Sequence, residues 1–162
     1  YNKTEIIKDV TINNIKINKT DSIGETKIYK PVEDEKVMFK NTNENETEEI
    51  VYTGEMESNI KQQKISNQGG IIAFRYAINN LSTYISNENE EVDYGKLLQL
   101  TDIKEENIKT TISFDFIITL TTNRKYQTNI QIDIPAKEVI EKGVAGIELT
   151  EFNNLIFKRI EN

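Results

Sequence analysis

The sequence of 162 residues contains no cysteine, no histidine and no tryptophan. The lack of cysteine excludes disulfides, thiolate zinc sites and a cysteine nucleophile. The lack of histidine removes the usual general base at neutral pH and the commonest metal ligand. Without tryptophan, only tyrosine and phenylalanine remain as rings that could stack on a sugar. These absences argue against an enzyme, and we expect no catalytic residues, no metal and no cofactor.

Basic residues are outnumbered: 20 lysines and arginines stand against 27 aspartates and glutamates, for a net charge of −7. This balance argues against binding to a nucleic acid backbone or to an anionic membrane surface. No apolar run is long enough to span a bilayer, and no signal peptide is visible. The chain opens at Tyr1 and not at methionine. We therefore expect a trimmed or processed chain, with any membrane anchor in a segment before Tyr1.

The apolar residues are few but well patterned, at 36% of the chain against 29% charged residues. Patterning of this kind argues against disorder throughout. The length favours a single domain with one sizeable core. We see no repeat and no linker, so we expect one domain over residues 1–162.

The most regular pattern lies over positions 111–135, where apolar and polar residues alternate on both sides of the polar break at 122–124. A period of two places each apolar set on one face of a strand. Pro135 cannot donate to a strand ladder and ends the second strand. We therefore predict a central β-hairpin with one wet face and one face that must be covered. Its even-numbered apolar residues should be buried: Ile112, Phe114, Phe116, Ile118, Leu120, Tyr126, Ile130, Ile132 and Ile134.

Residues 2–17 fit two patterns. Ile6, Ile7 and Val10 are spaced as on the last turns of a helix. Alternatively, a strand begins at Asp9 and slips by one residue at Asn13–Asn14. Its nearly alternating residues are Val10, Ile12, Ile15 and Ile17. Because short apolar segments suit both periods, the two alternatives remain open.

Further short elements follow from local signals. A turn is predicted at 21–24, and Asp93 is expected to cap a short helix that carries leucines. Residues 136–142 fit two helical turns stopped by Gly143, with a loop as the alternative. The residues around 71–77, turning at Asn79–Asn80, predict a second hairpin with 81–85. Other strand candidates are 27–29, 36–40, 49–54, a strand beginning at Ile147 and Leu149, and a final strand with Leu155, Phe157 and Ile160.

Two further segments can be compared with known kinds of binding site. Residues 41–49 read NTNENETEE, and alternating amide and carboxylate oxygens could coordinate calcium. The stretch lacks the aspartate positions and the fixed glycine of an EF-hand loop, so we favour a solvated, mobile loop. Gly69–Gly70 predicts a turn and not a phosphate loop, because no Lys-Ser/Thr follows it.

Asp115 and Asp133 both project from the polar face of the central hairpin. Paired acids can cleave glycosidic bonds when they are held at a defined separation and one pKa is raised by burial. Strand positions open to water do not raise a carboxylate pKa in this way, so we favour a solvated strand face. A Lys–Asn isopeptide bond promoted by a buried acid is a further option, although the sequence shows no such triad.

Several residues together resemble a known family. Lys8-Asp9-Val10, at the end of a helix if one forms there, is similar to the basic-Asp-aliphatic signature that ends the long helix of type IV pilins and secretion pseudopilins. Phe74-Arg75-Tyr76, then Asn80-Leu81, then Leu97-Leu98 ahead of the strand at Phe114 resemble the larger minor pilins. The family's processing site and apolar spine would lie before Tyr1. The resemblance implies an exported ectodomain that joins a filament through an N-terminal helix largely absent from this chain.

We therefore predict an α+β fold, mostly antiparallel sheet, with short helices covering one face. The expected function is a non-catalytic, pilin-like assembly subunit of a type IV pilus or secretion pseudopilus. It would lie at the cell surface or outside the cell, touch a membrane only through the missing segment, and bind other protein subunits and no nucleic acid. The alternative is a ligand-binding β-domain of a bacterial surface protein that recognises a glycan or a host protein.

Charge suggests where a partner would dock. Loops 41–49 and 86–92 carry acidic residues without compensating bases, whereas Lys61, Lys64 and Arg75 supply a modest positive region between them. Exposed pairs are weak and screened by salt, so such charges would act mainly on the association rate. The simpler interpretation, that these loops only keep the protein soluble, is the one we favour.

Overall fold

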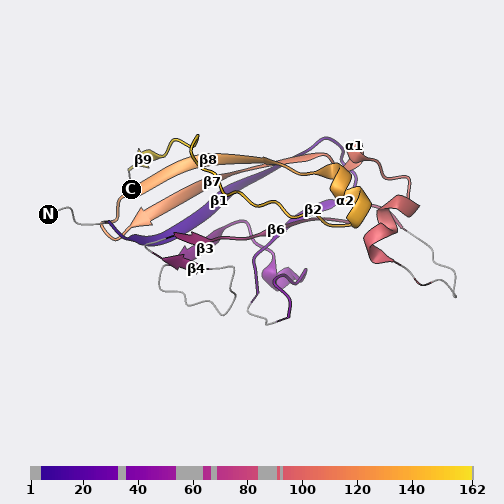
Figure 1. Cartoon of the computed structure of the whole chain (residues 1–162), viewed down its shortest axis with the longest axis horizontal. Helices are drawn as coiled ribbons and strands as arrows, with labels where there is room; N and C mark the ends of the chain where they lie inside the picture. The colour runs from indigo at the N-terminus through magenta and orange to yellow at the C-terminus, as the bar shows by residue number, and fades with distance from the viewer. Residues whose placement is uncertain are drawn as a thin grey trace.

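The computed structural model describes residues 5–32, 36–53, 64–66, 69–83, 91 and 93–161. These residues form an α+β fold that is mostly antiparallel sheet, as predicted (Figure 1). One sheet has the strand order β3-β1-β7-β8-β9, and two-stranded sheets pair β2 with β6 and β4 with β5. The strands are β1 (Ile7–Lys19), β2 (Glu25–Tyr29), β3 (Ile50–Thr53), β4 (Lys64–Ser66), β5 (Gly69–Ile71), β6 (Arg75–Asn79), β7 (Thr110–Leu120), β8 (Lys125–Asp133) and β9 (Lys158–Ile160).

The predicted central hairpin is confirmed as β7 and β8. Phe114 pairs with Ile130 and Ile118 pairs with Tyr126, so the two apolar sets share one face of the sheet. The turn is closed by a hydrogen bond from the backbone N–H of Leu120 to the carbonyl of Arg124, at 2.9 Å. Asn123 takes the left-handed conformation that this tight turn needs, with φ at 61°.

Burial of the even-numbered residues is confirmed only in the half of the hairpin that lies away from the turn, and it is partial for the other residues. Ile112, Phe114 and Ile130 are 1–6% exposed. Phe116, Ile118, Ile132 and Ile134 are half-buried and pack against the same core.

Of the two alternatives for the N-terminal residues, a helix or a strand, the structure shows a strand, β1. Ile12 pairs with Phe116 and Ile17 pairs with Ile112, on either side of a register shift between Asn13 and Lys16. The predicted slip is thus a β-bulge, with Asn14 at a φ of 50°. The helix alternative is wrong from Glu5 onwards, and residues 1–4 lie outside the described part. Lys8-Asp9-Val10 lies inside β1 and does not end a helix.

The apolar face is covered mainly by other strands and connections. Ile28 of β2 and Tyr76 of β6 pack against the core, and the rings of Phe74 and Phe114 meet edge to face with centroids 5.5 Å apart. Leu155, in the connection that leads to β9, also packs there. Strands and a connection therefore occupy the place that we had predicted for helices.

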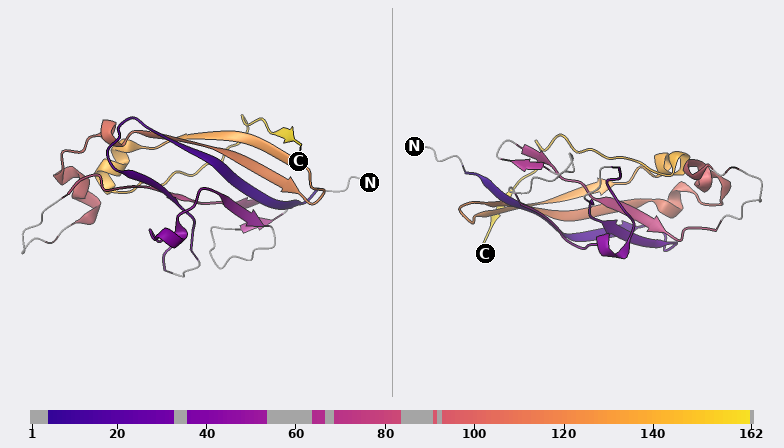
Figure 2. Two further views of the ribbon diagram at one scale, coloured as in Figure 1. Left: turned by 180° about the vertical axis from the view of Figure 1, so that it is seen from behind. Right: turned by 90° about the horizontal axis from the view of Figure 1, so that it is seen from below.

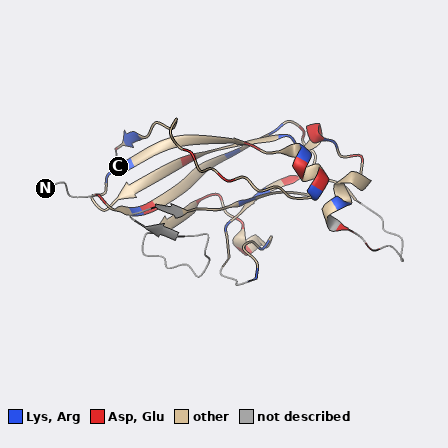
Figure 3. Ribbon diagram, in the orientation of Figure 1, with Lys and Arg blue, Asp and Glu red and all other residues tan. Residues whose placement is uncertain are grey.

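The short helices lie together at one end of the sheet, so the prediction that they cover a face is wrong (Figures 1 and 2). They are η2 (Tyr94–Leu100), α1 (Glu105–Ile108) and α2 (Ala136–Lys142), while η1 (Asn43–Asn45) belongs to the loop before β3. Helices α1 and α2 carry exposed charged residues and offer little apolar surface for covering a sheet (Figure 3). Among the described residues, no helix is both long and apolar enough to cross a membrane.

Local signals predicted the caps better than the short strands. Asp93 caps η2 by accepting from the backbone N–H of Gly95, and Gly143 ends α2 with a φ of 72°. Residues 36–40 and those around Ile147 and Leu149 form no strand, and β6 pairs with β2 instead of with 81–85. Of residues 81–85, the last two lie outside the described part. Of the predicted final strand, only Ile160 lies in β9, whereas Leu155 and Phe157 precede it, and α1 was not predicted.

Candidate functional site

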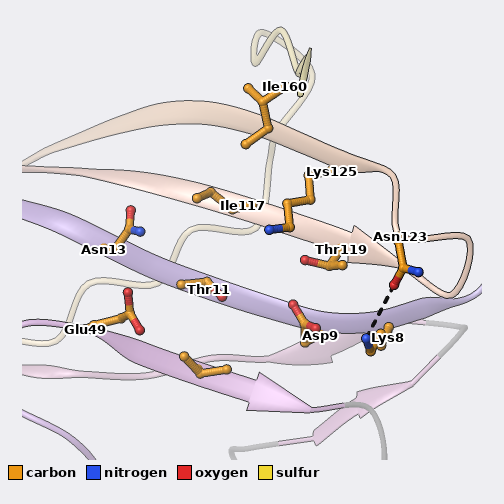
Figure 4. Close-up of a pocket in the computed structure, with 11 residues that line it drawn as sticks. Lys8, Asp9, Thr11, Asn13, Glu49, Ile117, Thr119, Asn123, Lys125 and Ile160 are labelled. Atoms are coloured by element: carbon orange, nitrogen blue, oxygen red, sulfur yellow. Dashed lines mark hydrogen bonds between the residues drawn. The ribbon is translucent and has the colours of Figure 1, made fainter. Parts of the chain in front are cut away.

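The polar face of the large sheet holds a shallow basin of about 510 Å³ near the turn between β7 and β8 (Figure 4). Its floor is apolar at Val51, Ile117 and Ile160, which come from three different strands. Lys8 and Asp9 lie next to each other near Asn123, Lys125 projects from β8, and Glu49 lies at the opposite end of the basin from Lys8. The Lys8 ammonium donates to the Asn123 side-chain oxygen at 3.5 Å. We call this site the polar-face basin.

The chemistry of the basin suits binding better than bond cleavage. Both signs of charge stand on an open strand face, and no described pair of side chains there joins a nucleophile to a base. Among the described residues, no three acidic side chains come together in a way that would hold a metal ion. A small dipolar molecule or a short stretch of peptide would find side chains of both signs of charge in this basin.

The two candidate acids lie on the same face of the hairpin but far apart. Asp115 pairs with Asn129, and Asp133 pairs with Thr111, so they are four residues apart along the ladder. That offset corresponds to about 13 Å along the strands. Glycosidase carboxyl pairs lie about 5–9.5 Å apart. The two acids are therefore not placed as a glycosidase pair.

The immediate surroundings of Asp115 also favour its charged form. Partial burial acts to raise the pKa of Asp115. Side-chain amides of Asn129 and Asn14, each 3.0 Å from a carboxylate oxygen, outweigh that effect and lower the pKa from its ordinary value. A carboxyl group with a lowered pKa is a poor general acid at neutral pH. Asp133 accepts a hydrogen bond from the Thr111 hydroxyl at 2.7 Å.

Loop 41–49 is more ordered than the solvated, mobile loop that we favoured. It contains η1, and Asn45 is buried. The backbone N–H of Thr47 donates to the carbonyl of Ile28 at 3.0 Å, and Glu46 bridges to Tyr29. The Glu46 carboxylate also accepts from the Lys27 ammonium at 2.9 Å, which raises the pKa of Lys27. The prediction of uncompensated acids is therefore wrong for Glu46.

A second hollow, of about 590 Å³, lies between β1 and β2, and we call it the β1–β2 slot. Its apolar lining comes from Ile15 and Ile17 of β1 and Ile28 of β2. The connection that leads into β3 borders the slot and contributes its carboxylates. The remaining lining residues are Asn13, Asn14, Thr26, Lys27, Glu46, Thr47, Glu48 and Glu49. Asn13 and Glu49 line both hollows, so the slot and the polar-face basin adjoin.

Other candidates from the sequence are not gathered at these hollows. Arg75 is exposed on β6, opposite Tyr29. Lys61 and most of loop 86–92 lie outside the described residues, as does the side chain of Lys64. Gly69–Gly70 belongs to strand β5 and not to a turn. Within the described chain, the buried polar residues are Asn45, Thr110, Thr119 and Thr128, so no buried acid is present there to promote an isopeptide bond.

Sequence reasoning missed both hollows because each depends on long-range pairing. The basin combines β1 and β3 with β7, β8 and β9, which lie far along the chain. The one usable signal was the Asn13–Asn14 slip, which marks the place where β1 bends beside both hollows. No family model, no curated protein and no solved structure matches this chain.

Proposed function

We propose that this chain is a non-catalytic, pilin-like assembly subunit that acts at the surface of a bacterial cell or outside it. It joins other protein subunits of a filament or surface assembly, and a segment before Tyr1 provides any link to the membrane. The proposal draws on the absence of cysteine and histidine, on the wide antiparallel sheet, and on the likeness of residues 74–76, 80–81 and 97–98 to minor pilins.

The observation that carries the proposal is the connection between α2 and β9. Apolar side chains in this stretch are exposed, from 43% at Ile147 and Leu149 to 76% at Ile156. Residues 144–151 lie outside helices and strands, and their backbone groups bond to no described backbone group. Exposed apolar surface beside unpaired backbone is typical of a region that another protein covers. The other exposed apolar residues of the connection are Val144 and Phe152.

A fractionation experiment tests this function. Filaments are sheared from cells that produce the protein, pelleted and probed for the chain. We expect the wild type in the pellet and a marked loss of the Ile147→Ser/Leu149→Ser double variant, since both side chains are about half exposed and contribute little to the core. Thr150→Ser, in the same connection, is the matched control. Recovery of the wild type only as a cytosolic monomer would overturn the proposal.

The second candidate, a ligand-binding β-domain, draws on the polar-face basin. Its opposite charges and apolar floor suit a dipolar ligand better than a glycan, because no described aromatic side chain lines it. Tyr29 and Tyr52 are buried, and Tyr76 and Tyr126 are half-buried. A glycan array tests for glycan binding, and a dipeptide screen by ligand-observed NMR tests for binding of a dipolar ligand. Hits that Lys125→Gln abolishes would favour this candidate, and silence in both screens would eliminate it.

A further inference from the structure

We propose that the β1–β2 slot receives an extended, basic segment of another protein as an added β-strand. This inference rests on the proposed function, because it names the kind of partner segment that an assembly subunit would engage. The ligand is a peptide of about five residues, with aliphatic side chains at alternate positions and lysine or arginine between them.

The first support is the backbone on the β1 side of the slot. Strand β3 pairs with β1 only from Asp9 to Ile12, so the same edge of β1 has no partner among the described residues from Ile15 onwards. The opposite edge of β1 pairs with β7 along the strand, interrupted only by register shifts between Ile7 and Asp9 and between Asn13 and Lys16. The open edge over residues 15–19 is about 16 Å long at the strand rise of roughly 3.3 Å per residue. An extended chain of about five residues fits that length.

The second support is the backbone on the β2 side. Strand β2 pairs with β6 along its whole length, and among the described residues its other edge meets only the loop at residues 45–47. The Ile28 carbonyl faces that loop, where it accepts from Thr47. Backbone N–H and C=O groups point to alternate sides of a strand from one residue to the next. The N–H and C=O of Thr26 therefore point to the same side as the carbonyl of Ile28. Although β1 and β2 are consecutive, they belong to different sheets and diverge from the turn that joins them (Figure 2).

The third support is the lining of the slot. Ile15, Ile17 and Ile28 give it apolar surface that an aliphatic side chain can cover. The charges on its rim are mostly negative, and the Lys27 ammonium is already bonded to Glu46 at 2.9 Å. Glu48 and Glu49 form no ion pair with a described residue. A basic strand therefore complements the slot, whereas an acidic strand is repelled from it.

The test uses fluorescein-labelled heptapeptides of alternating lysine and isoleucine, with capped ends, titrated into the whole chain. Anisotropy measures affinity, and amide NMR shifts locate the site. A peptide with glutamate in place of lysine controls for charge. A peptide N-methylated on alternate amides controls for backbone pairing. We expect shifts confined to residues 13–19, 26–28 and 46–49.

Two matched variants sharpen the result. We expect Glu48→Gln/Glu49→Gln to weaken binding of the lysine peptide about three- to tenfold, because each exposed pair contributes only about 0–1 kcal/mol. Glu151→Gln, an exposed acid away from the slot, should leave affinity unchanged. N-methylation should weaken binding about tenfold or more, since it removes several backbone hydrogen bonds at once.

Equal affinity for the lysine and glutamate peptides, an undiminished affinity of the N-methylated peptide, or shifts outside the slot would each overturn the proposal. Dimerisation of the chain without peptide, abolished by Glu48→Gln/Glu49→Gln, would identify a second copy as the occupant and overturn it as well. These measurements do not depend on where the protein resides. An empty slot in a chain that still cosediments with surface filaments therefore refutes this inference and leaves the proposed function standing.

Discussion

Asp115 shows how single residues shape the polar face of the sheet. It lies in the middle of β7, where Asn14 of β1 and Asn129 of β8 both donate to its carboxylate. These hydrogen bonds connect three neighbouring strands through one side chain. Since the amides favour the charged form, the pKa of Asp115 is lowered even though partial burial opposes the shift.

The lowered pKa predicts a dependence of stability on pH. The native state binds fewer protons than the unfolded state in the range where the unfolded carboxyl titrates, at about 3.8. The contribution of Asp115 to the free energy of unfolding is thus fully present above that pH, and it is lost as the pH falls through the lowered pKa of the native state. We expect the free energy of unfolding, measured by urea denaturation at pH 6, 4 and 3, to fall more steeply with decreasing pH in the wild type than in Asp115→Asn. An equal dependence of the unfolding free energy on pH in the two proteins would show that Asp115 is not its source.

At the scale of elements, the bulge in β1 keeps one side of a long strand apolar. Asn14 takes a φ of 50°, and the register shift lets Ile15 and Ile17 follow Val10 and Ile12 on the core face. A one-residue slip without the bulge would turn the later isoleucines towards solvent. The bulge also brings the Asn14 amide to Asp115, at 3.0 Å.

A pair of substitutions at this bulge separates backbone strain from side-chain bonding. Asn14→Ala and Asn14→Gly both remove the hydrogen bond to Asp115, but only glycine adopts the left-handed conformation without strain. We expect the alanine variant to be less stable than the glycine variant by about 1–2 kcal/mol. Urea denaturation measures the difference. Equal stabilities would mean that the bulge relaxes without cost.

The hairpin β7–β8 predicts graded costs for core truncation. Phe114 is 3% exposed and meets Phe74, whereas Phe116 is half-buried and meets Phe157 with ring centroids 6.2 Å apart. Phe114→Ala should therefore cost about 3–5 kcal/mol of unfolding free energy, the range for a buried aromatic ring. Phe116→Ala should cost clearly less, because part of its ring already contacts water. Chemical denaturation of both variants checks the order, and a larger loss at Phe116 would refute it.

The elements that the sequence predicts well are those with strong local signals. The hairpin at 111–135 combines a period of two with a turn, and α2 has a glycine stop at Gly143. Predictions failed where the partner was distant. Strand β6 pairs with β2, some fifty residues earlier, although the nearer residues 81–85 looked like a hairpin partner. Residues 147–149 have an alternating pattern but pair with no strand in the described part of the chain, so they form no ladder there.

At the scale of the whole molecule, the candidate site depends on contacts that no local pattern encodes. The slot and the basin meet at Asn13 and Glu49, beside the place where β3 ends its pairing with β1. The length of that pairing decides how much of the β1 edge stays open. Sequence patterning predicts that a strand exists, but it leaves open where each partner starts and stops. The acidic character of loop 41–49 was visible in the sequence, whereas its place beside an open strand edge was not.

The topology predicts that the two ends of the chain differ in their importance for folding. Strand β1 lies between β3 and β7 and contributes buried Val10 and Ile12, while β9 pairs with only three residues at the sheet edge. Deleting residues 1–13 should abolish cooperative unfolding, because β3 loses its partner and β7 becomes an open edge from Asp115 onwards, over an exposed core. Deleting residues 158–162 should leave a cooperative transition with a modest loss, since Leu155 and Phe157 remain. Circular dichroism during urea titration measures both. A stable chain without residues 1–13 would show that the rest of β1, together with β7, β8 and the β2–β6 layer, suffices for the core.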